Sequence, residues 1–146
     1  MKEWSFYGYN YVLVVSIISW FVAQLLKVIL VLLKTKRIDF TRFVGSGGMP
    51  SSHSSFVSAM AISVGRQEGF QSALFAVCCV MGLIVMYDAA GIRRAAGEQA
   101  MVLNKIVEEF THSDLKFEER LKELLGHTPI EVIAGAILGM IIAFAI

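Results

Sequence analysis

The chain has 146 residues, of which 56% are hydrophobic and 17% are charged. Soluble domains are nearer half apolar and roughly a quarter charged, so this composition excludes a typical soluble domain and indicates a polytopic membrane protein. The formal net charge of +1 gives no reason to expect a nucleic-acid partner. Cys78 and Cys79 are adjacent in an apolar segment, where we expect them to pack as small hydrophobic side chains.

The first apolar stretch, residues 7–33, is long enough to cross a membrane, for which about 20 apolar residues suffice. It lacks a small-residue cleavage pattern, so we expect it to remain in the mature protein. Lys27 interrupts it. The sequence favours a side chain that snorkels to the interface, and the alternative is an inward-facing functional cation.

A basic cluster follows this stretch, made of Lys34, Lys36, Arg37 and Arg42, whereas only Lys2 precedes it. The tendency of positive charges to remain inside predicts that this end of the helix faces the cytoplasm. The cluster is either an orientation signal alone or, in addition, a source of cations for a nearby anion.

Glycines, one proline, serines and a histidine form the segment from Gly47 to Ser55. Such a turn before a helix is suited to bind phosphate, because backbone N–H groups, hydroxyls and the helix N-terminus all favour an anion. The alternative is an ordinary N-cap, with His53 bonded only to a loop. These residues alone leave both interpretations open.

Three further spans are expected at about residues 51–65, 71–88 and 129–146, with an amphipathic cytoplasmic insert at about 95–125. We therefore expect an all-α membrane bundle of about four transmembrane helices, forming a single domain over residues 1–146 with both termini outside. Arg93 and Arg94 follow the third span, either as interface anchors or as phosphate ligands.

The last span opens with Thr128, Pro129 and Glu131, which form a capping box and do not require the preceding His127. His53, the two arginines and His127 all fall at helix ends on one side of the membrane. Two histidines with several cations are suited to phosphoryl transfer without a metal: one imidazole attacks phosphorus and the other protonates the leaving oxygen. Glu131, one turn after His127, would fix the tautomer of that histidine.

The order Pro50-Ser51-Ser52-His53, then arginine, then His127-x-x-x-Glu131 resembles the type 2 phosphatidic acid phosphatase superfamily, which is related to acid phosphatases and vanadium haloperoxidases. Its motifs read K-x6-R-P, P-S-G-H and S-R-x5-H-x3-D. The whole chain resembles a divergent branch of small membrane proteins in that superfamily.

The resemblance implies a role for each matching residue. His127 would be the nucleophile, Glu131 its orienting carboxylate and His53 the general acid. Phosphate would be bound by a larger set: Ser51, Ser52, Lys36, Arg42, Arg93 and Arg94. No cofactor or metal is implied.

The chain departs from the family motifs at several positions. Ser52 replaces a glycine, Glu131 replaces an aspartate, no Arg-Pro pair is present, and the insert separates the arginines from His127. A non-catalytic scaffold or anionic-lipid-binding protein is therefore an alternative. Another is a metal-dependent hydrolase with His53, His127, Glu131 and Asp88 as ligands.

The expected substrate is a phospholipid or a polyprenyl phosphate or pyrophosphate, met at the cytoplasmic face of the cell membrane. Hydrolysis would proceed through a phosphohistidine intermediate. The sequence does not choose among these lipids. Pairing of two copies would bury polar surface of the short second span, so a homo-oligomer is a further expectation.

Overall fold

The computed structural model describes residues 5–6, 9–36, 48–110 and 127–146. The described residues form five helices and one pair of two-residue strands, so the expected all-α class is confirmed. Strands β1 (Ser5–Phe6) and β2 (Tyr9–Asn10) pair antiparallel just before the first helix. The Asn10 side chain caps that helix by accepting a hydrogen bond from the Leu13 N–H group.

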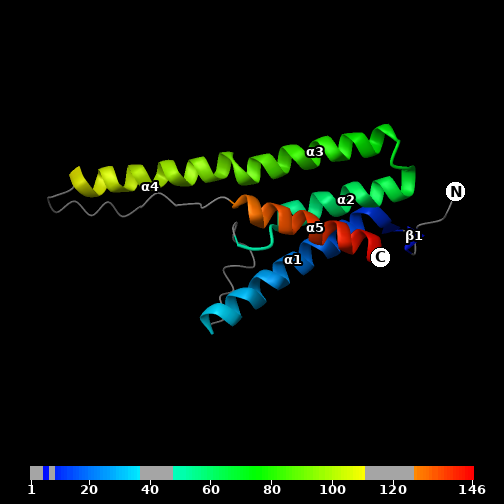
Figure 1. The fold of residues 1–146 in the computed structure, drawn as a ribbon, viewed down its shortest axis with the longest axis horizontal. Helices are drawn as coiled ribbons and strands as arrows, with labels where there is room; N and C mark the ends of the chain where they lie inside the picture. The colour runs from blue at the N-terminus through cyan, green and yellow to red at the C-terminus, as the bar shows by residue number, and fades with distance from the viewer. Residues whose placement is uncertain (1–4, 7–8, 37–47, 111–126) are drawn as a thin grey trace.

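Four helices form the bundle: α1 (Tyr11–Thr35), α2 (Ser52–Glu68), α3 (Ala73–Ala90) and α5 (Pro129–Ala145). Helix α2 packs against each of the other three (Figure 1). Strand β1 and the end of α5 lie at one end of the bundle. The start of α2, the end of α3 and the start of α5 meet at the opposite end.

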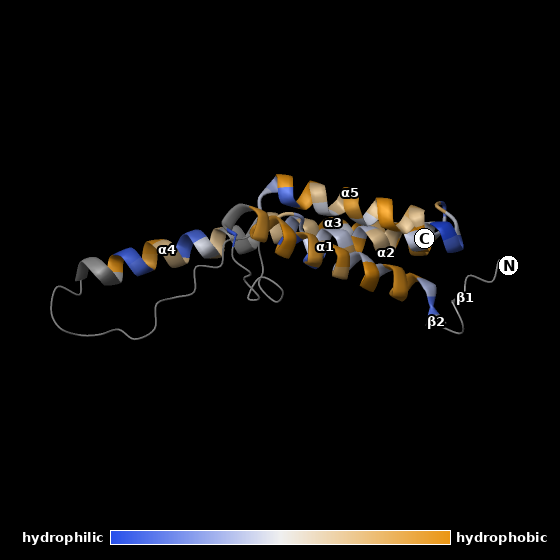
Figure 2. Ribbon diagram, turned by 90° about the horizontal axis from the view of Figure 1, so that it is seen from below, coloured by the Kyte–Doolittle hydropathy of each residue, from blue (hydrophilic) through white to orange (hydrophobic). Residues whose placement is uncertain are grey.

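The outer faces of the bundle are apolar. Figure 2 shows hydrophobic residues along α1, α3 and α5, and large side chains such as Leu33, Leu83 and Ile130 are exposed. By length and composition, the runs Tyr11–Leu33 and Ala73–Ile106 could each cross a membrane, and α5 is a shorter apolar helix. These features define a membrane helical bundle.

Two glycines allow α5 to lie directly on α2. A Cβ atom on Gly135 would come within 2.2 Å of the Ser51 carbonyl oxygen, and one on Gly139 within 2.2 Å of the Ser55 carbonyl oxygen. This is the close backbone approach that a Gly-x-x-x-Gly pair permits between membrane helices. The contact fixes α5 against the first two turns of α2, which carry His53.

A hydrogen-bonded arginine joins three helices at the other end of the bundle. Arg66 of α2 donates to the Tyr11 hydroxyl of α1 at 3.0 Å and to the backbone carbonyl of Ala143 in α5. Tyr11 is itself 2% exposed. The end of the bundle away from His53 is therefore held together by a partly buried polar contact.

Helix α4 (Ile92–Phe110) follows α3 after Gly91 and extends beyond the bundle (Figure 1). Polar and apolar residues alternate along it, and Val102, Leu103 and Ile106 are exposed (Figure 2). It occupies the first part of the insert expected at 95–125. The second part of that insert falls in residues 111–126, outside the described residues.

Candidate active site

Backbone hydrogen bonds gather three helix ends around His127. The His127 N–H group donates to the Ala89 carbonyl at the end of α3, at 3.0 Å. The Ser51 N–H group donates to the Glu131 carbonyl in the first turn of α5, at 2.9 Å. The segment that carries His127 is thus held both to α3 and to the turn before α2.

Glu131 serves two groups with one carboxylate oxygen. Its Oε2 accepts a hydrogen bond from the Thr128 N–H group at 3.0 Å and lies 3.2 Å from Nδ1 of His127. Thr128 in turn accepts from the Glu131 N–H group, which completes the capping box. The capping function and the histidine contact expected from the sequence are therefore both present and share one atom.

This contact assigns the His127 tautomer. A carboxylate accepts hydrogen bonds, so the contact favours the tautomer that carries its proton on Nδ1 of His127. The lone pair of the neutral ring then lies on Nε2, on the side away from Glu131. His127 is 2% exposed, so packing as well as hydrogen bonding fixes the ring.

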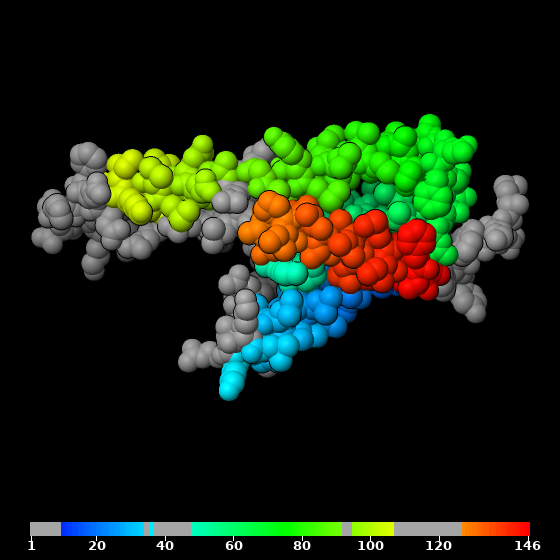
Figure 3. Space-filling model, viewed as in Figure 1, coloured from blue at the N-terminus to red at the C-terminus, as the bar shows by residue number. Residues whose placement is uncertain are grey.

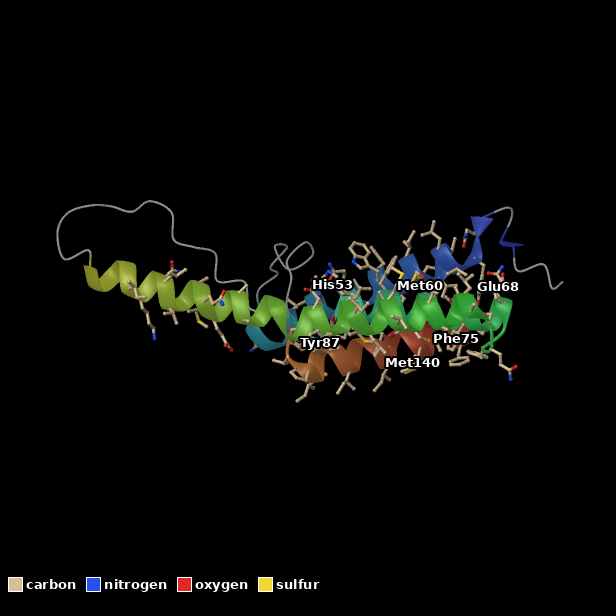
Figure 4. All side chains as sticks on the ribbon, turned by 90° about the horizontal axis from the view of Figure 1, so that it is seen from above. His53, Met60, Glu68, Phe75, Tyr87 and Met140 are labelled. Atoms are coloured by element: carbon tan, nitrogen blue, oxygen red, sulfur yellow. The ribbon has the colours of Figure 1, made fainter. Side chains whose placement is uncertain are left out.

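The second histidine lies beside the first. The ring centroids of His53 and His127 are 6.0 Å apart, and the rings meet edge to face at 64°. His53 is in the first turn of α2, at the end of the bundle where Tyr87 lies and opposite Glu68 (Figure 4). The two imidazoles are therefore close enough to act on one bound group.

Lys27 points into the bundle, so the favoured snorkelling interpretation is wrong. Its side chain is 2% exposed, and Nζ donates to the Ser52 hydroxyl at 3.1 Å. The Glu131 carboxylate attracts the same ammonium group electrostatically. Gly48 lies against the lysine stem, since a Cβ atom there would be 4.0 Å from Cδ. A buried cation is thus present next to the histidine pair.

The two serines expected to bind phosphate have different surroundings. The Ser51 side chain is the N-cap of α2 and accepts from the N–H and hydroxyl groups of Ser54, as the alternative interpretation of the turn expected. Ser52 is the first residue of α2 and receives the Lys27 hydrogen bond. Both side chains are buried, and a phosphate contact by either remains a prediction.

The expected cations outside the bundle core are placed as follows. Lys36 is exposed at the C-cap of α1, nine residues and about 13 Å of helix beyond Lys27. Arg93 and Arg94 lie in the first turn of α4, at the same end of the bundle as His53, and the structure does not describe their side chains. Arg42 lies outside the described residues.

The four ligands of the metal-dependent alternative are not assembled. Among the residues that the structure describes, no three His, Cys, Asp or Glu side chains are grouped as metal ligands. Asp88 is in the last turn of α3, next to Ala89, whose carbonyl binds the His127 N–H group. This arrangement disfavours the metal alternative.

The sequence contained a signal for the inward position of Lys27. Buried residues of α1 recur at helical spacing, at Val15, Ser19, Ala23 and Lys27, which places the lysine on the face that contacts the bundle. Lys27 and Lys34 also have the Lys-x6 spacing of the first superfamily motif, with lysine in place of arginine. The Gly135-x-x-x-Gly139 spacing likewise indicated a helix contact.

These features define a helical membrane protein with a paired-histidine site at one end of its bundle. Comparison with known families agrees: residues 9–142 match the family described as "Divergent PAP2 family". The chain belongs to this family, a divergent branch of the type 2 phosphatidic acid phosphatase superfamily.

A curated relative supports membership and membrane location. The chain is 37% identical over 148 residues to the "Uncharacterized membrane protein YuiD" of Bacillus subtilis (strain 168), covering 94% of each chain. No solved structure matches the chain.

Proposed function

We propose that the protein is a metal-independent lipid phosphatase that hydrolyses a phosphomonoester or pyrophosphate through a phosphohistidine intermediate. The observation that carries the proposal is the His127–Glu131 contact with His53 at 6.0 Å between ring centroids. A carboxylate-oriented imidazole beside a second imidazole supplies a nucleophile and a general acid in one site.

The reaction would proceed in two steps. First, Nε2 of His127 attacks phosphorus, the bond from phosphorus to the lipid oxygen breaks, and His53 gives its proton to that oxygen. Second, His53 takes a proton from water as the water attacks the phosphohistidine, which releases inorganic phosphate and restores His127. Glu131 stabilises the positive charge on the His127 ring in both steps.

Binding of the phosphate oxygens is assigned to Lys27 and the start of α2. The buried ammonium and the positive end of the α2 dipole both favour a group with two negative charges. Ser52 holds the ammonium beside the histidines. In this proposal Lys27 binds phosphate, the role that the family resemblance implied for Lys36. Arg93 or Arg94 adds a further positive charge.

The proposal includes the orientation of a single membrane domain. Helices α1, α2, α3 and α5 cross the membrane, and the end that carries His53 and His127 faces the cytoplasm. The basic cluster after α1 supports this orientation, because positive charges are retained inside. The substrate then enters from the cytoplasmic leaflet.

Leaving-group dependence tests the proposed roles. Purified protein in detergent is given an alkyl phosphate and a nitrophenyl phosphate, with excess chelator present. We expect His127→Ala to abolish release of both leaving groups. We expect His53→Ala to abolish release of the alkyl alcohol but to keep a first-turnover burst of nitrophenolate, because nitrophenolate leaves without a proton while hydrolysis of the phosphohistidine still needs His53. Loss of the nitrophenolate burst in His53→Ala would contradict a general-acid role.

A second candidate is a non-catalytic protein that binds anionic lipid. It is favoured by the Lys27–Ser52 hydrogen bond, since Ser52 stands where the family motif has glycine and engages the cation itself. This candidate predicts that Ser52→Gly creates or greatly raises phosphate release. The phosphatase proposal predicts release by the wild-type protein.

A further inference from the structure

An apolar pocket lies between α2, α3 and α5 below the histidines. Its volume is about 320 Å³, and its lining includes Val57 and Ala61 of α2, Cys79 and Gly82 of α3, and Met140 of α5. Figure 3 shows the hollow between α3 and α5, with α2 at its floor. The pocket opens towards the surface that faces lipid.

The pocket begins one helical turn from the proposed active site, and its lining does not include the histidines. His53, Val57 and Ala61 are spaced four residues apart on α2 and therefore share one face of that helix. On α3, Met86 lines the pocket three residues before Ala89, whose carbonyl binds the His127 N–H group. A chain attached to a group held by the histidines thus reaches the pocket within about one turn of α2 or α3.

The depth of the pocket matches one leaflet. Its α3 lining runs from Met86 to Phe75, which is about 16 Å of helix at 1.5 Å per residue. A bilayer has a hydrocarbon core of about 30 Å, so half of it is close to this depth. Phe75 bounds the far end and packs edge to face against Phe70 at 5.2 Å between ring centroids.

We infer that this pocket holds one hydrocarbon chain of the substrate, so that the protein selects lipid phosphates with a long linear chain over soluble phosphomonoesters. The inference rests on the proposed function for the identity of the headgroup. The headgroup lies between His53 and His127, and the chain follows the shared face of α2 down to Phe75. Any second chain of the lipid remains in the bilayer.

Filling the pocket provides the test. Gly82 is buried, and a Cβ atom there would meet Val57 only at ordinary contact distance, 3.8 Å, so a larger side chain projects into the pocket. Gly82→Phe and Cys79→Phe each place a phenyl ring in the pocket, and we call these two pocket-filling variants the plugs. Val80→Phe is the matched control, because Val80 is on the same helix, 56% exposed and outside the pocket lining.

Binding is measured without turnover. Each variant is made in a His127→Ala background, its thermal unfolding is checked, and native mass spectrometry measures retention of dodecyl phosphate, butyl phosphate and dodecanol. We expect dodecyl phosphate to bind about tenfold more tightly than either other compound. Both plugs should reduce that preference to about twofold, and Val80→Phe should retain it.

The outcomes separate this inference from the proposed reaction. A chain-length preference that survives in both folded plugs overturns the pocket assignment, and equal binding of dodecanol overturns the placement of the headgroup between the histidines. If the wild-type protein releases no phosphate but the plugs abolish the preference, the reaction is wrong and the chain site stands. If phosphate is released equally from both esters and the plugs change nothing, the reaction stands and the chain site is wrong.

Discussion

Lys27 in α1 donates a hydrogen bond to Ser52 at the start of α2, at 3.1 Å and across 25 residues of sequence. A buried ammonium group is costly unless polar groups and a counter-charge compensate it. The Ser52 hydroxyl and the attraction of Glu131 provide that compensation here. In the proposed enzyme, the substrate phosphate would become the main counter-charge of Lys27.

Lys27→Met keeps the length and apolar stem of the side chain and removes the charge. We expect phosphate release to fall by about 100-fold or more, since a preorganised cation that stabilises transition-state charge is worth this much. Lys36→Met is the matched control, because Lys36 is exposed at the end of α1. Steady-state kinetics that show an equal effect of the two substitutions would contradict the assignment.

Glu131→Gln separates the role of Glu131 in the capping box from its role in orienting His127. Glutamine still supports a capping box, so the start of α5 should be kept and any loss of stability should come from the missing counter-charge of Lys27. Glutamine no longer fixes the His127 tautomer as a carboxylate does. Activity should fall at least about 100-fold. Thr128→Ala should show the reverse, a loss of about 1 kcal/mol of stability with activity largely kept. Thermal unfolding and phosphate release measured on both variants check this, and parallel behaviour would refute it.

Gly135→Ala should disturb the site through the backbone. The added Cβ atom would overlap the Ser51 carbonyl oxygen, so α5 must move away from α2. We expect a destabilisation of about 1–3 kcal/mol together with reduced activity. Gly82→Ala in α3 is the control, because its Cβ atom has room. Unfolding curves in detergent that are the same for the two variants would show that the close approach is unimportant.

Tyr11→Phe tests the opposite end of the bundle. It removes the hydroxyl that accepts the Arg66 hydrogen bond, which should cost about 0.5–1.5 kcal/mol of stability. Activity should stay near that of the wild-type protein, because Arg66 is at the end away from His53. A large loss of activity in a protein that remains folded would mean that the two ends are coupled.

The sequence predicted the parts of this fold that depend on local pattern. Apolar length predicted the helices, and Thr128, Pro129 and Glu131 predicted the start of α5, since a capping box is a property of adjacent residues. The contact between His127 and Glu131 follows from their spacing of four residues across the N-cap of α5, where the capping box fixes the Glu131 side chain.

Contacts between segments that are far apart in the sequence were harder to predict from the sequence. Whether Lys27 snorkels or points inward depends on which face of α1 meets α2, and that face is set by Ser19 and Ser55, whose hydroxyl oxygens lie 2.7 Å apart. The hydrogen bond between the His127 N–H group and the Ala89 carbonyl likewise joins segments that have no sequence signal in common. The positions of Arg42 and of the second part of the insert lie outside the described residues.

Detection of the covalent intermediate tests the proposed phosphohistidine mechanism most directly. Purified protein is mixed with a lipid phosphate, quenched within its first turnover at alkaline pH to preserve a phosphohistidine, digested, and analysed by mass spectrometry. The phosphohistidine mechanism predicts a phosphoryl group on His127 that is absent from His127→Ala. Release of inorganic phosphate with no phosphoryl group on His127 at any time point would contradict it.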